Sequence, residues 1–294
     1  MVRQYKIHTN LDGNDNEIID LTDGKIRLYQ PSDLGIVTNT NIWSSQGLGV
    51  FGDTAISHPS MDFRLETFGD SLEENYQLMN EFVSKILAQK YVTIEYTSEM
   101  GTFYADVKLA KVSKTEGYGQ NGTFSETISF DVINKWYVYE ALTFKSFTEG
   151  ELTETSKIYS NSRYAYTDTT YTYYSEDNAE RFSKWLIKEG IFSFVARLTP
   201  SNSKTNTYGL RFLDEQANEY TSIILNLTNK PDYIQLNSDV NDEYYQASTA
   251  NTIVNMFSAL DFQKLRTRIF KKGTMELINL DSVEMNVKRK VDFV

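Results

Sequence analysis

The chain has 294 residues, of which 40% are hydrophobic and 14% aromatic, and its 29 basic and 40 acidic side chains give a net charge of −11. This composition excludes a disordered or fibrous chain, and the length predicts two globular domains. The sequence contains no cysteine, which excludes disulfides and thiol nucleophiles, and no apolar run reaches the roughly 20 residues of a membrane span. The acidic balance disfavours binding to nucleic acid, and we expect no membrane partner.

Residues 31–51 combine apolar side chains with three glycines and are too apolar for a connecting loop that is merely exposed to solvent. One interpretation is a long hairpin that packs on a neighbouring subunit. A loop that covers the core of its own chain explains the composition about as well. The candidate interface residues are Leu34, Ile36, Ile42, Trp43, Leu48, Val50 and Phe51.

Residues 71–90 carry the pattern of a helix. Ser71 and Glu74 have the spacing of a capping box, and apolar residues recur behind them at helical intervals. Residues 91–96 and 102–109 instead alternate apolar and polar side chains around a turn, which is typical of antiparallel strands. We therefore expect a mainly β protein with one helix in its N-terminal domain, packed on a sheet.

A second β-rich region begins near residue 137. Alternating segments at 191–198, 208–213 and 219–227 predict a compact β-sandwich. Residues 145–174 interrupt this region with few aliphatic side chains, and the interruption is too long for an ordinary connection within a domain. We expect this insertion to project from the sandwich or to be mobile.

The insertion is rich in tyrosine and threonine: residues 159–174 hold six tyrosines and four threonines in sixteen positions. Tyrosine offers a large rigid surface with a polar tip at low entropic cost, a mixture favoured on binding surfaces. An edge hairpin built from residues that favour β-structure is the alternative. The candidate partner-binding residues are Tyr159, Tyr164, Tyr166, Tyr171, Tyr173 and Tyr174.

Catalytic groups are few. His8 and His58 are the only imidazoles, and neither lies in a hydrolase, metalloprotease or phosphate-binding motif. Residues 12–16 offer oxygen ligands, but the segment departs from a calcium-binding loop at Glu17 and Asp23. Acid pairs of the kind used in glycoside hydrolysis arise by chance among 40 acids. The candidate pairs are Glu73 with Glu74, Asp214 with Glu215, and Asp242 with Glu243. We expect no enzymatic activity, no cofactor and no metal site.

Family-specific segments are spread over the whole chain. They are residues 1–13 (MVRQYKIHTNLDG), 29–32 (YQPS), 65–69 (LETFG), 71–79 (SLEENYQLM), 114–119 (KTEGYG), 266–269 (RTRI), 275–280 (MELINL) and 292–294 (DFV). Together they resemble the distal tail proteins of siphophages, in particular those of lactococcal phage baseplates. The resemblance runs from the first residue to the last.

This resemblance implies a homohexameric ring at the tip of a long non-contractile tail, with DNA passing through its lumen. The ring would join the tail tube protein to the tail-associated lysin or fibre protein. It implies a ring-forming domain of residues 1–136 with 281–294, and a galectin-like β-sandwich of residues 137–280. The expected location is the tail tip of the virion, after synthesis in the bacterial host cytoplasm, without specific nucleic-acid binding.

The insertion at 145–174 corresponds to the arm-and-hand extension with which this subgroup grips the receptor-binding protein. Residues 156–159 and 171–174 resemble the family, whereas residues 145–155 and 161–169 depart from it. The resemblance therefore implies the role of the arm but leaves open which partner its divergent part contacts.

Two other functions are possible, a carbohydrate-binding host-recognition module and a cell-wall glycosidase. A galectin sugar site needs His-x-Asn-x-Arg with Trp-x-x-Glu, and residues 137–280 contain no histidine. Trp185 is followed by Glu189, one residue too far away. We expect no carbohydrate affinity from that site.

Overall fold

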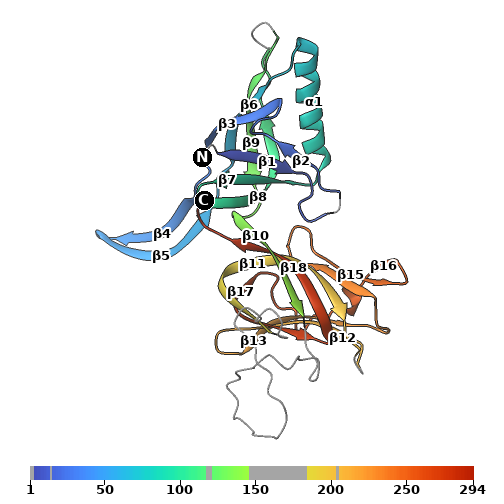
Figure 1. Cartoon of the computed structure of the whole chain (residues 1–294). Coiled ribbons are helices and arrows are strands. Elements are labelled where there is room, and N and C mark those ends of the chain that lie inside the picture. Colours follow the sequence, from blue (N-terminus) through green and yellow to red (C-terminus); the bar gives the residue numbers. More distant parts are fainter. Residues whose placement is uncertain (1–2, 14, 117–120, 146–183, 203–204) are drawn as a thin grey trace. The chain divides into compact units, whose positions relative to one another are not determined.

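The computed structural model describes residues 3–13, 15–116, 121–145, 184–202 and 205–294 (Figure 1). The chain forms two compact units. Unit 1 comprises Met1–Tyr139 with Lys290–Val294, and unit 2 comprises Glu140–Arg289. Both termini therefore belong to unit 1.

Unit 1 contains an antiparallel sheet in the order β3-β6-β9-β8-β7-β1-β2. Its strands are β1 (Gln4–His8), β2 (Ile18–Asp20), β3 (Ile26–Ser32), β6 (Met61–Thr67), β7 (Val92–Ser98), β8 (Gly101–Val112) and β9 (Ser125–Val132). Burial alternates along β6, where Met61, Phe63 and Leu65 point into the core. This period of two is the reason that the segment forms a strand with one buried face.

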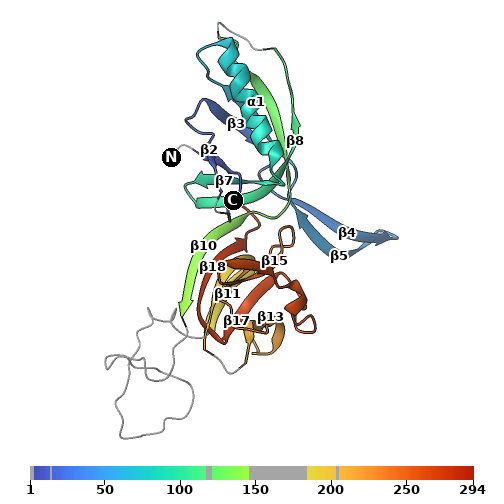
Figure 2. The same ribbon diagram turned by 90° about the vertical axis from the view of Figure 1, so that its right-hand side faces the viewer.

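Helix α1 (Leu72–Ala88) lies along this sheet (Figures 1 and 2). The hydroxyl of Ser71 accepts a hydrogen bond from the amide of Glu74 at 3.2 Å, so Ser71 is the N-cap. The Glu74 carboxylate accepts in return from the amide of Asp70 at 2.6 Å. Phe82 and Ile86 on its inner face are buried in the core of unit 1. The sequence prediction of this helix is confirmed.

Unit 2 is built from strands that pair in the order β13-β12-β17-β11-β18, with β14, β15 and β16 continuing from β11. Their bounds are β10 (Tyr137–Lys145, which enters from unit 1), β11 (Lys184–Pro200), β12 (Thr207–Leu213), β13 (Glu219–Asn226), β14 (Tyr233–Asn237), β15 (Tyr244–Thr249), β16 (Thr252–Asn255), β17 (Phe270–Ile278) and β18 (Leu280–Lys290), with a short 3₁₀ turn at Phe257–Ala259. The strands predicted at 191–198, 208–213 and 219–227 are all present. The prediction of a mainly β protein with an N-terminal-domain helix is confirmed, while the galectin-like character of the sandwich stays a prediction.

Aromatic side chains fill the core of unit 2. The ring of Phe270 lies 4.2 Å from Phe212, 4.9 Å from Phe194 and 5.6 Å from Phe192, centroid to centroid. All four side chains are buried. Aromatic pairs at these separations add about 0.5–1.5 kcal/mol each beyond the burial of their area, so this cluster is a main source of stability for unit 2.

The sequence-based domain bounds of residues 1–136 with 281–294, and of 137–280, stay a prediction. The two compact units of the structure divide after Tyr139, and the chain returns to unit 1 at Lys290. The late return follows from β18, which pairs with β11 from Arg289 opposite Phe192 to Leu280 opposite Pro200. Most of the C-terminal strand therefore belongs to unit 2.

Candidate functional site: an exposed apolar hairpin

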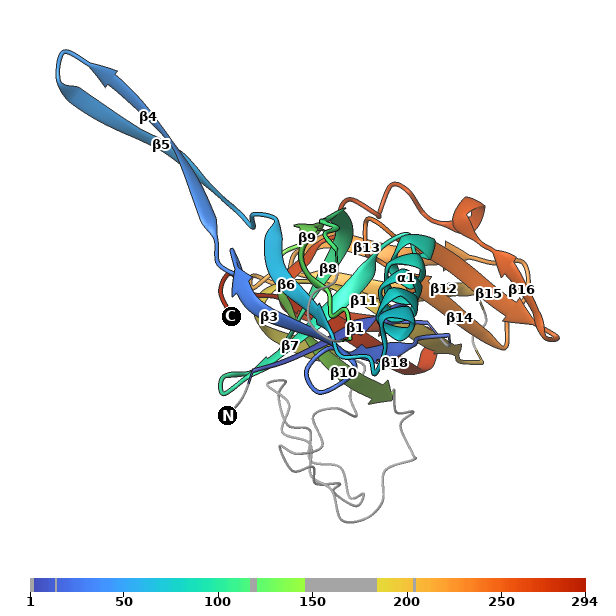
Figure 3. The same ribbon diagram turned by 90° about the horizontal axis from the view of Figure 1, so that it is seen from above.

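Strands β4 (Val37–Ser45) and β5 (Leu48–Ser57) form a long twisted ribbon (Figure 3). Among the strands that the structure describes, they pair only with each other. Gln46 and Gly47 connect them with φ angles of +51° and +81°. Positive φ at both central residues is the signature of the type I′ turn, whose twist matches that of the flanking strands.

The register of the hairpin sorts its apolar side chains onto two faces. Ile42 lies opposite Phe51, and Trp43 lies opposite Val50. Cross-strand partners share a face and successive residues alternate. One face of the tip therefore carries Ile42 and Phe51, and the other carries Trp43, Val50 and Leu48. Neither face is polar.

These side chains are exposed to an unusual extent for apolar residues. The exposed fraction is 64% for Trp43, 74% for Phe51 and 76% for Leu48. Contiguous exposed apolar surface is rare on monomeric soluble proteins and marks interaction sites. An isolated two-stranded hairpin is in addition only marginally stable in water without something to pack on. The hairpin has the properties of a surface that a partner covers.

The hairpin is also almost free of charge. From Val37 to Ser57 the only ionisable side chain is Asp53. Burial of the tip against another protein would therefore remove no charged group from water, which is the most expensive part of forming an interface. The lack of charge favours close apolar packing on both faces.

The structure places the predicted interface residues in two settings. All of them are exposed except Leu34, which is partly buried and packs against the core of unit 1. Sequence reasoning missed Val37 and Ile56, which are 43% and 37% exposed on the lower part of the hairpin. In the sequence, the apolar residue Ile56, four positions after Gly52, is the signal that the hairpin continues. Since the tip side chains are exposed, they do not cover the core of their own unit.

The predicted arm residues lie outside the described part of the chain. They are Tyr159, Tyr164, Tyr166, Tyr171, Tyr173 and Tyr174. Lys145, where the insertion begins, is the last residue of β10.

Both histidines make structural contacts. The Nε2 atom of His8 lies 2.8 Å from a carboxylate oxygen of Glu95, and its Nδ1 atom lies 3.0 Å from the side-chain nitrogen Nδ2 of Asn16. Burial opposes ionisation of Glu95, but hydrogen bonds from His8 and Lys6 outweigh it and hold its pKa below the usual range. His58 lies 3.1 Å from the carbonyl oxygen of Gly35, at the foot of the hairpin.

Each of the three candidate acid pairs has at least one member that contacts neighbouring structure. Glu74 pairs with Lys25 at 2.5 Å, and Glu243 pairs with Arg268 at 2.5 Å. Asp214 accepts the main-chain amides of Gln216 at 3.0 Å and Asn218 at 2.8 Å. These contacts stabilise a helix cap, a loop and a turn.

Two further searches concern only the residues that the structure describes. Within them, no three acidic or imidazole side chains gather closely enough to hold a metal ion. None of their helices is long and apolar enough to cross a membrane.

Comparison with known proteins links both units to one family. The model of the distal tail protein N-terminal domain matches residues 4–133, and that of the Dit C-terminal domain matches residues 135–294. The distal tail proteins of Lactococcus phages SK1 and p2 are each 54% identical to the chain over 299 aligned residues, which cover all of both proteins. These findings confirm the resemblance seen in the sequence.

Solved structures agree with this relationship. A chain of the phage P2 baseplate in its activated conformation with Ca matches with a TM-score of 0.83 at 54% identity, over the full length of both chains. The crystal structure of SPP1 Dit matches with a TM-score of 0.55 at 12% identity, over 99% of this chain and 100% of the other. At that identity the second match supports the fold alone.

Proposed function

The chain belongs to the distal tail protein family, and we propose that it forms a homohexameric ring in which the β4–β5 hairpin of each copy packs on a neighbouring copy. As a member of this family it is a structural component of the phage baseplate, at the tail tip of the virion. The family relationship gives the baseplate role, whereas the hexamer and the residues that close it are part of the proposal. They are supported by the exposed apolar hairpin of unit 1.

The two-faced exposure of the hairpin tip carries this proposal. A ring closes through a heterologous interface, in which one surface of each copy meets a different surface of the next. Trp43 and Phe51 lie on opposite faces of the ribbon, so covering both requires that the tip be enclosed and not laid flat. A projecting element on one copy and a receiving surface on the next is the arrangement that a closed ring needs.

Membership of the family supports a proposal for the other contacts of the ring. The ring would connect the tail tube protein to the tail-associated lysin or fibre protein and let DNA pass through its lumen. The insertion at 145–174, with its six tyrosines, would hold the receptor-binding protein. Deletion of this insertion is expected to abolish incorporation of the receptor-binding protein into tails, measured by quantitative immunoblot of purified virions. Normal incorporation would overturn the role of the arm without affecting the ring.

The ring proposal is tested by the mass of the purified protein in solution. We expect light scattering to show hexamers of the wild-type chain at high concentration or with tail tube protein added. The double variant Trp43→Ser/Phe51→Ser should remain monomeric, because it removes the largest apolar group from each face. A matched control is Ile253→Ser/Phe257→Ser, which removes apolar side chains of 53% and 45% exposure from unit 2. Hexamers of the hairpin variant, or wild-type monomers under every condition, would contradict the proposal.

A further inference from the structure

The β4–β5 hairpin joins the sheet of unit 1 through a short foot, which consists of residues 33–36 and 58–60. The last β3–β6 pair before the foot is Ser32 with Asp62, and the first pair of the hairpin beyond it is Val37 with Ser57. Neither segment of the foot belongs to a strand. Figure 3 shows the ribbon projecting beyond β3 and β6. The direction of the hairpin therefore depends on what fixes these few residues.

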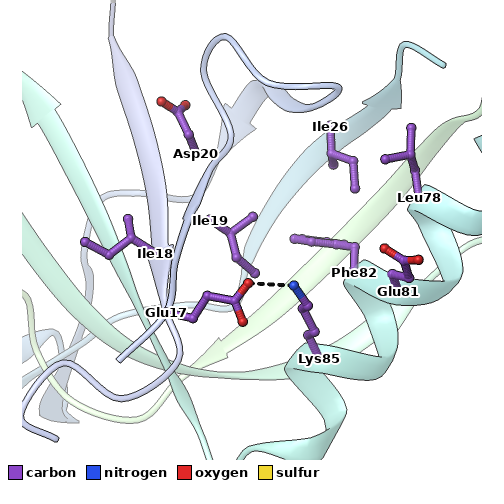
Figure 4. A pocket seen from close by; sticks show the side chains of 9 residues that line it. All are labelled: Glu17, Ile18, Ile19, Asp20, Ile26, Leu78, Glu81, Phe82 and Lys85. Atoms are coloured by element: carbon purple, nitrogen blue, oxygen red, sulfur yellow. Dashed lines mark hydrogen bonds and ion pairs between the residues drawn. The ribbon is translucent and has the colours of Figure 1, made fainter. Parts of the chain in front are cut away.

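The edge strand β2 of the same sheet shows a contrasting arrangement, because it is held from two sides. It pairs with β1, and Glu17, which precedes it, forms an ion pair with Lys85 of α1 at 2.6 Å (Figure 4). Ile19 of the strand and Phe82 of the helix line the pocket between them. The hairpin has no comparable second support, since among the described strands β4 and β5 pair only with each other.

The backbone of the foot suits a change of direction. Asp33 has a φ of +60°, so the chain turns directly after β3 ends at Ser32. Gly35 follows two positions later and, without a Cβ atom, has the widest choice of backbone angles in the foot. A few loop residues that absorb changes of φ and ψ are what a hinge requires. A foot of this kind holds one angle only if other contacts restrain it.

The first restraint is a hydrogen bond between the two segments of the foot. The Nδ1 atom of His58 lies 3.1 Å from the carbonyl oxygen of Gly35. A carbonyl oxygen can only accept, so Nδ1 carries the proton and donates it. The Nε2 atom is buried and bonds to none of the residues that the structure describes. A buried acceptor without a partner is destabilising, so an apolar side chain would suit this position better if the bond to Gly35 had no role.

The second restraint is the ring of Phe293, which lies over Gly35. A Cβ atom at Gly35 would lie 3.8 Å from the Cε2 atom of Phe293, an ordinary contact distance. The ring is 71% exposed, but it is carried by a segment that is itself anchored on unit 1. The anchoring contacts are the bond from the amide of Val291 to Trp136 at 2.8 Å, the Lys135–Asp292 ion pair at 2.5 Å, and the packing of Val291 and Val294 against the core of unit 1.

We propose that residues 33–36 and 58–60 form a hinge, and that His58 and Phe293 hold it at one angle so that the hairpin projects in a fixed direction. Both act as positioning residues, since they lie at the foot and not at the exposed tip. A hairpin whose direction is fixed beforehand loses less conformational entropy when its tip is covered. The inference concerns a single chain, so it goes beyond the proposed ring and does not depend on it.

Distances between two spin labels test the hinge, because the chain has no cysteine of its own. One label is attached at Ser45→Cys beside the hairpin turn, and the other at Gln77→Cys on α1, since both positions are exposed. Double electron–electron resonance is measured where light scattering shows monomers. We expect a single narrow distance distribution for this doubly labelled chain. His58→Ala should widen it about twofold by freeing the hinge. His58→Asn should keep it narrow, because the asparagine amide also donates a hydrogen bond.

The contact of Phe293 is tested on the same labelled chain. Phe293→Ser should also widen the distribution while the thermal unfolding midpoint stays unchanged, because the ring is already 71% exposed. Gly35→Ala should leave it as narrow or narrower, since alanine restricts the backbone. The matched control is Phe262→Ser, which removes a phenyl group of 51% exposure from unit 2. Unchanged widths for both His58→Ala and Phe293→Ser would overturn the hinge, as would equal widening by the control, and the ring proposal would be unaffected.

Discussion

Two hairpins of this protein contain similar amounts of apolar side chain and use them in opposite ways. In the β12–β13 hairpin of unit 2, Leu210, Phe212 and Leu225 are completely buried. In the β4–β5 hairpin of unit 1, Trp43 and Phe51 are more than 60% exposed. The difference shows that apolar content alone does not decide whether a hairpin belongs to a core.

What differs is the cover that the chain itself provides. The outer edge of β13 is closed by the following segment, since the amide of Asp261 donates to Ile224 and Leu260 forms a bridge with Leu225. The inner face of β12 packs on Phe270. No described segment closes either edge of the β4–β5 ribbon. The first hairpin completes a domain, and the second is left for another molecule.

The largest effect expected from this difference is on stability. Phe212→Ala should lower the free energy of unfolding of unit 2 by about 3–5 kcal/mol, because it opens a cavity among Phe194, Tyr220 and Phe270. Phe51→Ala should change the stability of the monomer by less than about 0.5 kcal/mol, because the phenyl group of Phe51 is already largely exposed to water. Chemical denaturation of both variants measures this, and equal losses would show that the hairpin tip packs on its own chain.

A smaller effect is expected at the two turns. Ala217, in the turn between β12 and β13, has a φ of +63°, which costs a residue with a Cβ atom about 1 kcal/mol. Ala217→Gly should therefore stabilise unit 2 by at most about 0.6 kcal/mol, after about 0.4–1 kcal/mol is deducted for the entropy that glycine adds to the unfolded chain. In the other hairpin Gly47→Ala should weaken the turn, where φ is +81°. Thermal unfolding of both variants gives the comparison, and a destabilised Ala217→Gly would refute the role of turn strain.

The smallest expected effect is on the pH dependence of stability. Of the two turns, only the one between β12 and β13 contains a titratable group. The main-chain amide of Asn218 is the main cause that holds the pKa of Asp214 below its usual range. A depressed pKa means that the ionised form stabilises the fold above the unfolded pKa of about 3.9, and that this contribution is lost as the pH falls through the folded pKa. The stability advantage of the wild type over Asp214→Asn should be present at pH 7 and vanish at low pH. An advantage independent of pH would contradict this.

The sequence predicts best those elements whose causes are local. Ser71 and Glu74 are three positions apart, and their contacts in the structure are the ones that a capping box requires. Alternation of apolar and polar residues likewise identifies β7, β8 and β12 from their own residues. These elements depend little on distant parts of the chain.

Features that depend on distant partners are harder to predict. The assignment of β18 to unit 2 follows from its pairing with β11, about ninety positions earlier in sequence numbering, and local pattern does not reveal which strand is the partner. Leu34 and Ile36 look equivalent in sequence, yet only Leu34 reaches the core of unit 1. Of the candidate site, the sequence could give the apolar residues of the hairpin but not their arrangement on two faces, which the register decides.

The central claim is that the β4–β5 hairpin is covered only when copies of the chain assemble. Hydrogen exchange of the wild-type protein tests it most directly, measured by mass spectrometry on separated monomers and assembled rings. We expect the amides of Val37–Ser57 to exchange rapidly in the monomer and at least tenfold more slowly in the ring. Amides of the β12–β13 hairpin should exchange slowly in both. Equal exchange of Val37–Ser57 in monomer and ring would contradict the account.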